Sequence, residues 1–353
     1  MASDMADPSS LPYSANSCLP HLPPREASVA LSLFYTVLLV FSALGNILAL
    51  CLACQKDKKI NSTGVYLVHL AVSDLLFSLA LPGKITYYVL DFSWPFGDGL
   101  CRLTAFIMYL NTYGGVYLMT CVSVDRYLAV VCTHQSQRLR STGRAKLICV
   151  AVWVLALLQN VPLLLTPMAK PMAGKLTCME YVSVEPILGL PVMVLAACVI
   201  SFCMPVVIIL FCYVKIALKL CSTARENPVA SGKGHPRRAC LLTLVVLVAV
   251  VLCFSPYHLN VMQFMVREML GPPSCAEQRA FTLALQVTVS FMNVNCGIDP
   301  IIYFFASTRY RKWLLGILKL GASSSSSFSS SSPGRASSET QTGGSVTILE
   351  NQV

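Results

Sequence analysis

Long apolar segments without a charged residue recur along the chain. A helix needs about 20 consecutive apolar residues to cross the hydrocarbon core of a bilayer. Six segments come close to or exceed this length: Val29–Ala53, Leu103–Val124, Leu147–Ala169, Pro186–Val214, Ala239–Val266 and Ala280–Ile298. A seventh, about Val65–Pro82, is interrupted only by His69 and Asp74. The pattern predicts an all-α membrane protein, a bundle of seven transmembrane helices.

The composition agrees with this pattern. Of 353 residues, 55% are hydrophobic and only 12% are charged, which is far outside the usage of soluble domains. No Cys/His spacing typical of a metal site, no glycine-rich phosphate loop and no hydrolase nucleophile motif is present. We therefore do not expect an enzyme.

The basic residues predict the orientation in the membrane. Cytoplasmic loops next to helix ends carry an excess of Lys and Arg. With the N-terminus outside and the C-terminus in the cytoplasm, 19 of the 26 Lys and Arg residues fall on the cytoplasmic side and 7 outside. This topology accounts for the net charge of +10, so the charge does not indicate nucleic-acid binding. We expect a multi-pass protein of the plasma membrane.

The chain divides by composition into four parts. Residues 1–28 form an extracellular segment, and residues 29–305 contain the seven spans. Residues 306–320 combine basic residues with apolar ones at helical spacing, which predicts a short amphipathic eighth helix in contact with membrane lipids. Residues 321–353 include Ser323–Ser327 and Ser329–Ser332, a composition typical of a disordered tail, which is also a candidate for phosphorylation.

Most of the sixteen cysteines lie in the spans, where they act as small apolar residues. Four fall on the outer side. Cys101, at the top of the third span, and Cys178, in the loop after the fourth, could form a disulfide that holds this loop over the bundle. Cys18 and Cys275 would then tie the N-terminal segment to the last outer loop.

Two acidic residues lie within the membrane, where charge is costly and tends to be functional. Asp74 on the second span and Asp299 on the seventh would reach a similar depth, together with Asn46 and Asn295. Each Asp could be a hydrogen-bonded packing residue. Two carboxylates beside amide oxygens also form a plausible sodium site, and without a cation one Asp would have to be protonated.

Prolines mark places where several spans can bend. A proline removes one backbone hydrogen bond from a helix and permits a kink. Pro256 follows Cys253-Phe254-Ser255, which places an aromatic residue beside the hinge, and Asp299-Pro300 is followed by Tyr303 near the cytoplasmic end. Further prolines inside or near the ends of spans are Pro82, Pro162 and Pro205.

These residues together resemble the rhodopsin-like class of G-protein-coupled receptors. Arg126 lies 25 residues after Cys101, about 37 Å of helix, so the two lie at opposite membrane faces. The resemblance covers about residues 29–320 and includes one signal on each span: Gly45-Asn46, Leu70-Ala71-Val72-Ser73-Asp74, Asp125-Arg126-Tyr127, Trp153, Pro205 with Tyr213, Cys253-Phe254-Ser255-Pro256 and Asp299-Pro300-Ile301-Ile302-Tyr303.

The resemblance implies roles for these residues. At rest Arg126 would be held by Asp125, and it would engage a heterotrimeric G protein when the sixth helix swings outward about Pro256. Tyr213 and Tyr303 would then turn inward. Arrestin and receptor kinases would act at the Ser-rich tail.

This chain departs from the pattern of the class at two positions. Phe254 stands where many relatives have Trp, and Gly115 stands where a hydroxyl commonly joins the sodium site. The segment Lys233–Arg238 also offers no acidic partner for Arg126, which predicts appreciable ligand-independent signalling.

Within that class the chain is similar to receptors for hydroxylated cholesterol derivatives. The similarity lies in Lys59-Ile60-Asn61-Ser62-Thr63, Tyr109-Leu110-Asn111-Thr112-Tyr113, Leu176-Thr177-Cys178-Met179-Glu180-Tyr181, Phe254-Ser255-Pro256-Tyr257-His258 and Met292-Asn293-Val294-Asn295-Cys296. It implies coupling to inhibitory G proteins, a role in immune-cell migration, and ligand contacts from Tyr109, Tyr113 and Tyr257. Lys84 stands where those receptors have an Arg that bonds a ligand hydroxyl.

The residues themselves indicate a similar pocket. Tyr109, Tyr113 and Tyr117 recur at i, i+4 and i+8, a spacing that suits either packing or a ligand-facing stripe of phenols. No Asp lies in the outer half of the third span, which disfavours an amine ligand. A nucleotide, lysophospholipid or other anionic lipid would suit Lys84 with nearby basic residues. A transporter or channel would need a continuous polar path, and the intramembrane charge is confined to one cluster.

Overall fold

The computed structural model describes residues 23–53, 60–133, 139–172, 174–179, 189–226, 235–271, 273–306, 310–313 and 315–316. The chain divides into two compact units, residues 1–311 and 312–353. The fold described below belongs to the first unit.

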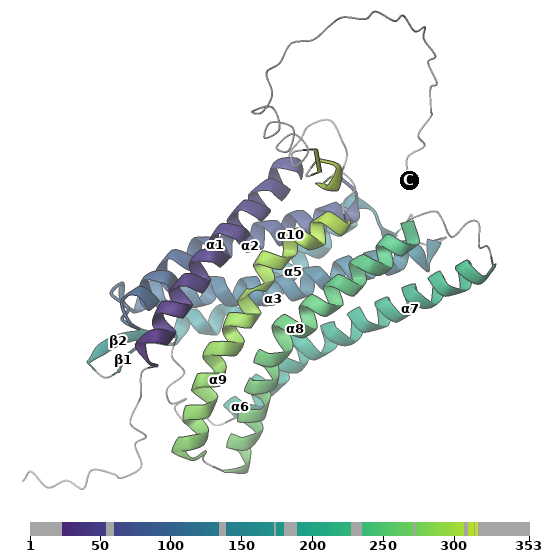
Figure 1. The fold of residues 1–353 in the computed structure, drawn as a ribbon. Coiled ribbons are helices and arrows are strands. Elements are labelled where there is room, and N and C mark those ends of the chain that lie inside the picture. The colour runs from purple at the N-terminus through teal and green to yellow at the C-terminus, as the bar shows by residue number, and fades with distance from the viewer. Residues whose placement is uncertain are drawn as a thin grey trace, which may run out of the picture. The chain divides into compact units, whose positions relative to one another are not determined.

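Helices dominate this unit (Figure 1). Seven helical stretches are long and apolar enough to cross a membrane, which confirms the predicted bundle. Two of them combine several elements: α6, η1 and α7 form the fifth span, and α9 and α10 form the seventh. The elements are α1 (Arg25–Ala53), α2 (Ser62–Val89), α3 (Gly97–Val130), α5 (Thr142–Leu165), β1 (Ala169–Met172), β2 (Lys175–Cys178), α6 (Leu190–Cys198), η1 (Val199–Cys203), α7 (Met204–Glu226), α8 (His235–Leu270), α9 (Cys275–Asn293) and α10 (Asn295–Ala306).

Polar side chains begin several of these helices. The side chain of Asn61 accepts a hydrogen bond from the backbone N–H of Gly64 before α2, and Ser141 accepts one from Arg144 before α5. Ser274 and Glu277 form a reciprocal capping box at the start of α9. These contacts satisfy backbone N–H groups that a helix leaves without partners in its first turn.

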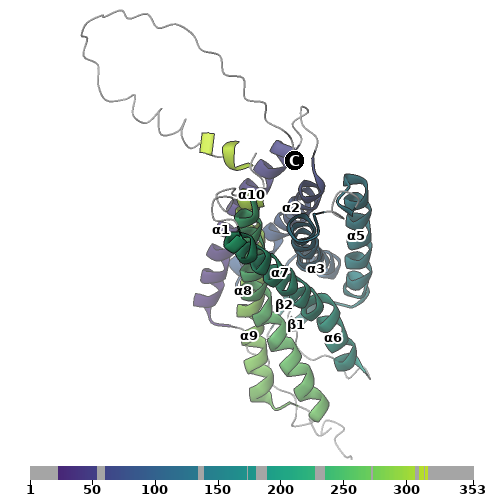
Figure 2. The same ribbon diagram turned by 90° about the vertical axis from the view of Figure 1, so that its right-hand side faces the viewer.

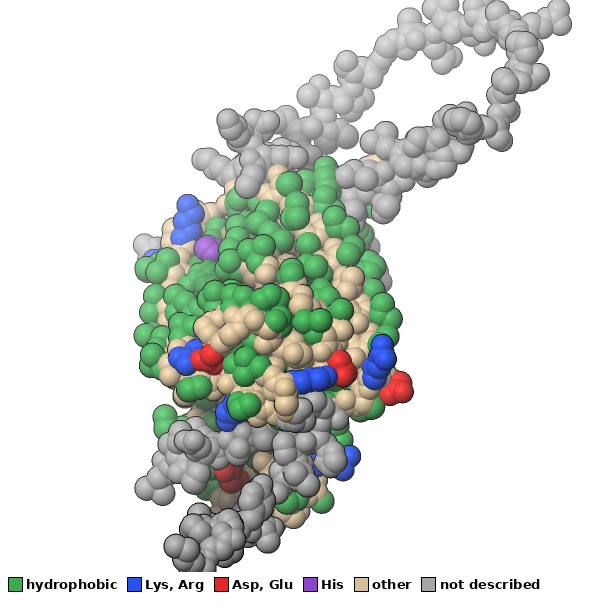
Figure 3. All heavy atoms as spheres, turned by 90° about the vertical axis from the view of Figure 1, so that its left-hand side faces the viewer, with side chains coloured by type: hydrophobic (Ala, Val, Ile, Leu, Met, Phe, Trp, Pro, Cys, Tyr) green, Lys and Arg blue, Asp and Glu red, His purple; other side chains and the backbone are tan. Residues whose placement is uncertain are grey.

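The distribution of polar and apolar side chains is inverted relative to a soluble protein. Leu79, Leu147 and Leu165 are 70–76% exposed, while Asn46, Asp74 and Asp299 are completely buried. Hydrophobic side chains cover most of the described surface in Figure 3. In lipid this arrangement is favourable because apolar side chains meet hydrocarbon and polar groups find partners inside the bundle.

Helix α3 lies at the centre of the bundle and is the most deeply buried of the seven spans. It packs against α2, α5, α7 and α8, whereas α1 packs against α2 and α10 (Figures 1 and 2). Many of the polar contacts described below therefore involve residues of α3.

The seventh and fifth spans both contain a local irregularity. The break between α9 and α10 falls at Val294, between two asparagines. In the fifth span, the π-helical segment η1 ends two residues before Pro205. π-helical turns are rare and occur frequently at functional sites.

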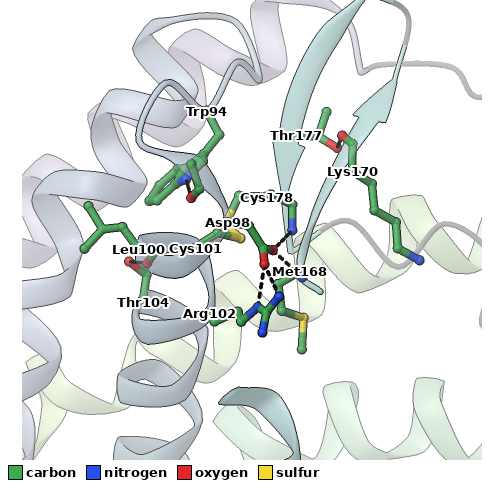
Figure 4. Close-up of a disulfide and its surroundings, with 12 residues drawn as sticks. Trp94, Asp98, Leu100, Cys101, Arg102, Thr104, Met168, Lys170, Thr177 and Cys178 are labelled. Atoms are coloured by element: carbon green, nitrogen blue, oxygen red, sulfur yellow. Dashed lines mark hydrogen bonds and ion pairs between the residues drawn. A yellow bond between two sulfur atoms is a disulfide. The ribbon is translucent and has the colours of Figure 1, made fainter. Parts of the chain in front are cut away.

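A short antiparallel hairpin, which the sequence pattern did not predict, covers the outer end of α3. Strands β1 and β2 pair Ala169 with Cys178 and Met172 with Lys175. Cys178 forms the predicted disulfide with Cys101, which ties the hairpin to α3 (Figure 4). Cys275 is also disulfide-bonded, and its expected partner Cys18 lies outside the described residues.

Hydrogen bonds hold the hairpin in addition to the disulfide. Asp98 accepts hydrogen bonds from the backbone N–H groups of Met168 and Ala169, each at 2.8 Å, and pairs with Arg102 (Figure 4). Lys175 bonds Asp91 at 2.8 Å, and this hydrogen bond holds the pKa of Asp91 below its usual value. The outer end of the bundle is thus fixed at several points around α3.

Some of the predicted boundaries are corrected or lie outside the described residues. Helix α1 begins at Arg25, four residues before Val29, where the first span was predicted to start. Within the predicted eighth helix, residues 310–313 and 315–316 are helical and its other parts are not described, so an amphipathic helix over 306–320 stays a prediction. The tail at 321–353 is also outside the described residues.

The contact between α1 and α10 predicts a specific destabilising substitution. A Cβ atom at Gly45 would overlap the ring of Pro300. We expect Gly45→Ala to destabilise the protein by about 1–3 kcal/mol, the usual cost of overpacking, and to lower its melting temperature when purified in detergent. Gly143→Ala is the matched control because nothing lies within 4 Å of a Cβ there. A melting temperature for Gly45→Ala equal to that of the control would contradict this packing.

Candidate functional site

A cavity opens between α2, α3 and α9, next to the end of the hairpin. Most of its lining is apolar, and three methionines contribute to it. Its residues are Lys84, Met108, Tyr109, Met179, Leu285, Gln286, Val289, Met292 and Asn293. Ligand pockets typically combine an apolar wall with a few polar groups in this way.

Lys84 is the cationic residue of this lining and is only 6% exposed. Its ammonium nitrogen lies 5.5 Å from the centre of the Tyr88 ring, a cation–π contact. The hydroxyl of Tyr88 donates a hydrogen bond to Gln286 at 3.4 Å. The structure therefore places Lys84, a predicted ligand contact, in the lining of the cavity and within a partly aromatic environment.

Three of the predicted tyrosines lie together beside the cavity. Tyr109 lines it, and the ring of Tyr113 stacks on that of Tyr109 with centroids 6.2 Å apart. The Tyr257 hydroxyl donates to the Tyr109 hydroxyl at 3.5 Å. Helices α3 and α8 thus meet through phenol groups at this depth.

Tyr117, the fourth of the predicted tyrosines, lies apart from this cluster. Its hydroxyl donates to Gln159 of α5 at 2.8 Å, and it is not among the residues lining the cavity. Eight helical residues correspond to about 80° of rotation beyond two full turns, so Tyr117 leaves the face of Tyr109. The prediction of a common stripe neglected this drift, and Tyr117 joins α3 to α5 instead.

Deeper in the bundle, Asp74 is the centre of a hydrogen-bond network. It accepts from Asn111 of α3 at 2.9 Å and from Tyr303 of α10 at 3.4 Å. Tyr303 also donates to Asn46 of α1 at 2.8 Å. The sequence did not predict the role of Asn111, because an uncharged amide in an apolar span stands out less than an acidic residue does.

The second half of the predicted cation site lies on α10. The side-chain amide of Asn295 donates to Asp299 at 3.2 Å, and Asp299 is completely buried. The Oδ1 atoms of both residues have no hydrogen-bond partner in the described part of the chain. Buried oxygens of this kind are the ligands that a hard cation such as sodium takes, so the residues fit the predicted ion. Gly115 leaves room here, since a Cβ would lie 3.7 Å from Asn295.

At the opposite end of α3, Asp125 has more partners than the sequence suggested. Ser62 donates to it at 2.6 Å, Thr63 donates to its other oxygen, and Arg140 approaches both oxygens at 3.1 and 3.2 Å. Arg126 makes one contact to Asp125 at 3.3 Å. Charge-assisted N–H···O bonds are commonly 2.7–2.9 Å long. The expected ion pair between Asp125 and Arg126 therefore has a long N···O distance, and Arg140 binds the same carboxylate.

The other predicted activation residues are distributed along four helices, α3, α7, α8 and α10. Tyr127 contacts the ring of Phe211 with centroids 5.7 Å apart, and Tyr213 is half-buried on α7. Phe254 is fully buried on α8, two residues before Pro256. Pro300 lies within α10 beside the polar network. The side chains of Lys233–Arg238 lie outside the described residues, so their expected lack of an acidic partner stays a prediction.

The chain is similar to known receptors over most of its length. Residues 45–303 match the family described as 7 transmembrane receptor (rhodopsin family). G-protein coupled receptor 183 of Homo sapiens is 40% identical over 321 residues, which cover 90% of this chain and 89% of that protein. G-protein coupled receptor 183-A of Danio rerio is 43% identical over 294 residues, covering 83% and 80%.

A receptor named for other ligands is also related. The uracil nucleotide/cysteinyl leukotriene receptor of Mus musculus is 32% identical over 314 residues, which cover 89% of each chain. All of these proteins are receptors and not enzymes. Because the match extends across all seven spans, the chain belongs to the rhodopsin family of G-protein-coupled receptors, multi-pass proteins of the plasma membrane.

Proposed function

We propose that this receptor binds a lipid-like ligand with few hydroxyl groups, of the hydroxylated sterol class, and activates inhibitory G proteins. The observation that carries the proposal is the lining of the cavity, where apolar side chains surround phenol, amide and ammonium groups and no described lining residue is acidic. Apolar surface supplies most of the affinity for such a ligand, and a few polar groups fix its orientation.

The chemistry of the lining supports a neutral and largely apolar ligand. Met108, Met179 and Met292 have flexible side chains that adapt to an irregular apolar shape. Tyr109 and Lys84 can bond hydroxyl groups at two sides of the cavity. An amine would meet Lys84 without an acidic counter-charge, which disfavours it.

An anionic ligand is the second candidate. Lys84 is a nearly buried cation in the cavity, and a phosphate or carboxylate would compensate its charge. A related receptor is named for uracil nucleotides and cysteinyl leukotrienes, which are anionic. The phenol cluster and the methionines favour the sterol class over this alternative.

Substitution of Lys84 tests the ligand assignment. In cells that express the receptor, we expect hydroxysterols to inhibit cyclic-AMP formation, and pertussis toxin to abolish the response. Lys84→Ala should weaken sterol binding by about tenfold to a hundredfold because a charge-assisted hydrogen bond is lost, while Lys84→Arg should retain or improve it. Arg25→Ala is a control, since Arg25 is an exposed cation near Asp91 at the same end.

The same cyclic-AMP assay distinguishes anionic ligands from hydroxysterols. Nucleotides and lysophospholipids are applied in parallel with the sterols. A response to these anions alone, lost in Lys84→Ala, would refute the sterol assignment and support the second candidate.

We also infer that a sodium ion is held by Asp74, Asp299 and Asn295 in the resting receptor. The support is the buried carboxylate pair together with the two oxygens that have no described partner. Without a cation, one of these carboxyl groups has to carry a proton to avoid repulsion.

Sodium should therefore stabilise the purified receptor. We expect the melting temperature to rise with NaCl and to follow mass action, but not with choline chloride at equal ionic strength. Asp74→Asn should remove the difference between the two salts, because the ion loses a charged ligand. An equal effect of both salts on the unsubstituted receptor would show that no specific site exists.

The shared contacts of Asp125 bear on signalling without ligand. Arg140 competes with Arg126 for the same carboxylate, and the Nε of Arg126 is buried with no partner in the described part of the chain. We infer that Arg126 is weakly restrained, which supports the expected ligand-independent activity.

Removal of Arg140 should lower that basal activity. In Arg140→Ala, Arg126 becomes the remaining described cation on Asp125, and a gain of about 0.5–1 kcal/mol in this pair would reduce basal G-protein activation about twofold to fivefold. Lys146→Ala, on the exposed first turn of α5, is the control. GTPγS binding to membranes with matched receptor amounts measures the effect.

Two other outcomes are informative. Basal activity that stays unchanged or rises in Arg140→Ala would contradict competition for Asp125. A proportional loss of basal and ligand-stimulated activity would instead indicate that Arg140 contacts the G protein.

The wider role follows from this assignment as part of the proposal. The receptor would guide immune-cell migration toward its ligand, as the resemblance to oxysterol receptors implies. Arrestin and receptor kinases would act on the Ser-rich tail, which lies outside the described residues.

A further inference from the structure

His258 is a completely buried polar residue on α8, two positions after Pro256. Its Nδ1 atom lies 2.8 Å from the backbone carbonyl oxygen of Phe254. A carbonyl oxygen can only accept a hydrogen bond, so Nδ1 carries the hydrogen and donates it. In the neutral ring, Nε2 is then an acceptor with a free lone pair.

The Nε2 atom has no hydrogen-bond partner in the described part of the chain. None of the ion pairs found among the described residues involves this imidazole. A charged ring would therefore be buried without a described counter-ion, which favours the neutral form. A buried acceptor without a donor costs free energy, and a ligand that supplies the donor recovers it.

Aromatic side chains hold the imidazole in place. The ring of Phe202, from η1, stacks on it with centroids 4.3 Å apart and planes 8° apart. Tyr257 meets it edge-on at 5.0 Å, and Tyr113 of α3 lies 6.5 Å away. Because packing from three helices fixes the ring, the imidazole has little freedom to turn toward another donor.

His258 adjoins the phenol cluster of the cavity. Tyr109 lines the cavity and bonds Tyr257, whose ring contacts His258 directly. The Tyr109–Tyr257 hydrogen bond is long, at 3.5 Å, so a ligand hydroxyl group can replace it at small cost. A ligand hydroxyl that separates these two phenols would come next to the imidazole, because the ring of Tyr257 contacts it directly.

We propose that His258 determines ligand specificity by accepting, at Nε2, a hydrogen bond from a hydroxyl group of a bound and otherwise apolar ligand. This inference rests on the proposed sterol-like ligand and adds a chemical requirement to it. An alcohol donates to the free lone pair, whereas an ether, ketone, carboxylate or phosphate ester presents only acceptors and is rejected. Lys84 then serves the opposite end of the ligand, where it donates.

Methyl ethers of the ligand test this requirement. The probes are hydroxysterols that carry hydroxyl groups on the ring system and at the end of the side chain, with each hydroxyl methylated in turn. Methylation removes the donated hydrogen and retains the oxygen. We expect one ether to bind the unsubstituted receptor about threefold to tenfold more weakly than its parent alcohol, the effect of one hydrogen bond.

His258 variants assign that loss to the imidazole. In His258→Phe, the parent sterol and the critical ether should bind equally, because the acceptor is gone. His258→Gln keeps one donor for the Phe254 carbonyl and one acceptor for the ligand, so it should restore part of the preference for the alcohol. Displacement of a radiolabelled hydroxysterol from membranes of expressing cells gives the affinities, and cell-surface amounts show whether each variant folds.

The outcomes separate this inference from the proposed function. Sterol binding with equal affinity for every alcohol and ether in the unsubstituted receptor overturns the role of His258 and leaves the ligand class intact, even where His258→Phe does not fold. A preference for the alcohol that persists unchanged in His258→Phe overturns it as well. Absence of binding by any hydroxysterol refutes the proposed function and, with it, this inference.

Discussion

The fold depends on the requirement that a polar group inside a membrane finds its partner within the protein. Asp74 is the strongest case, because its carboxyl group is fully buried and lipid supplies no hydrogen bond. Donors from Asn111 and Tyr303 satisfy it, and Tyr303 continues the network to Asn46. Helices α1, α2, α3 and α10 therefore share one set of hydrogen bonds. Apolar packing alone would not fix their depth, since Leu packs equally well against Leu and against a lipid chain.

The outer and inner ends of α3 are held in different ways. At the outer end, a disulfide and the hydrogen bonds of Asp98 fix the hairpin, which limits how far this end can move. At the inner end, Asp125 is bonded by hydroxyl and guanidinium groups that can exchange with other partners. The two ends therefore differ in how easily their contacts can rearrange: a covalent bond holds one, and exchangeable hydrogen bonds hold the other.

The sequence was sufficient for the seven spans because the thickness of a bilayer limits helix length, and charged residues interrupt the apolar runs. It also indicated Asp74 and Asp299, since intramembrane acidic residues are rare. It did not predict the contacts of Asn111 and Arg140. The partners of an uncharged amide inside a span, or of an arginine between two spans, become evident only when the helices are packed. The position of Tyr117 was misjudged for a related reason, as a repeat of four residues drifts around a helix of 3.6 residues per turn.

The hairpin could not be predicted because its two four-residue strands contain a proline and lack an alternating pattern. These strands are held by the Cys101–Cys178 disulfide and by hydrogen bonds from the backbone to Asp98. Such contacts join residues far apart in the sequence, so they are visible only in the folded structure. The same holds for His258. Its unused acceptor is evident only when the surroundings of both ring nitrogens are known. A histidine in an apolar run is otherwise indistinguishable from a satisfied core residue.

The cavity and the polar network meet at the break between α9 and α10. Asn293 lines the cavity and donates to Tyr35 at 3.0 Å, while Asn295, two residues later, bonds Asp299. Cys296, which follows Asn295, donates its thiol hydrogen to the backbone oxygen of Asn293 at 3.0 Å. A displacement of Asn293 would stretch these bonds or rotate the short segment around Val294, and either change would move Asn295, the partner of Asp299. The interrupted helix thus joins the wall of the cavity to the buried carboxylates through a few adjacent residues, because an unbroken helix would resist the same rotation along its entire length.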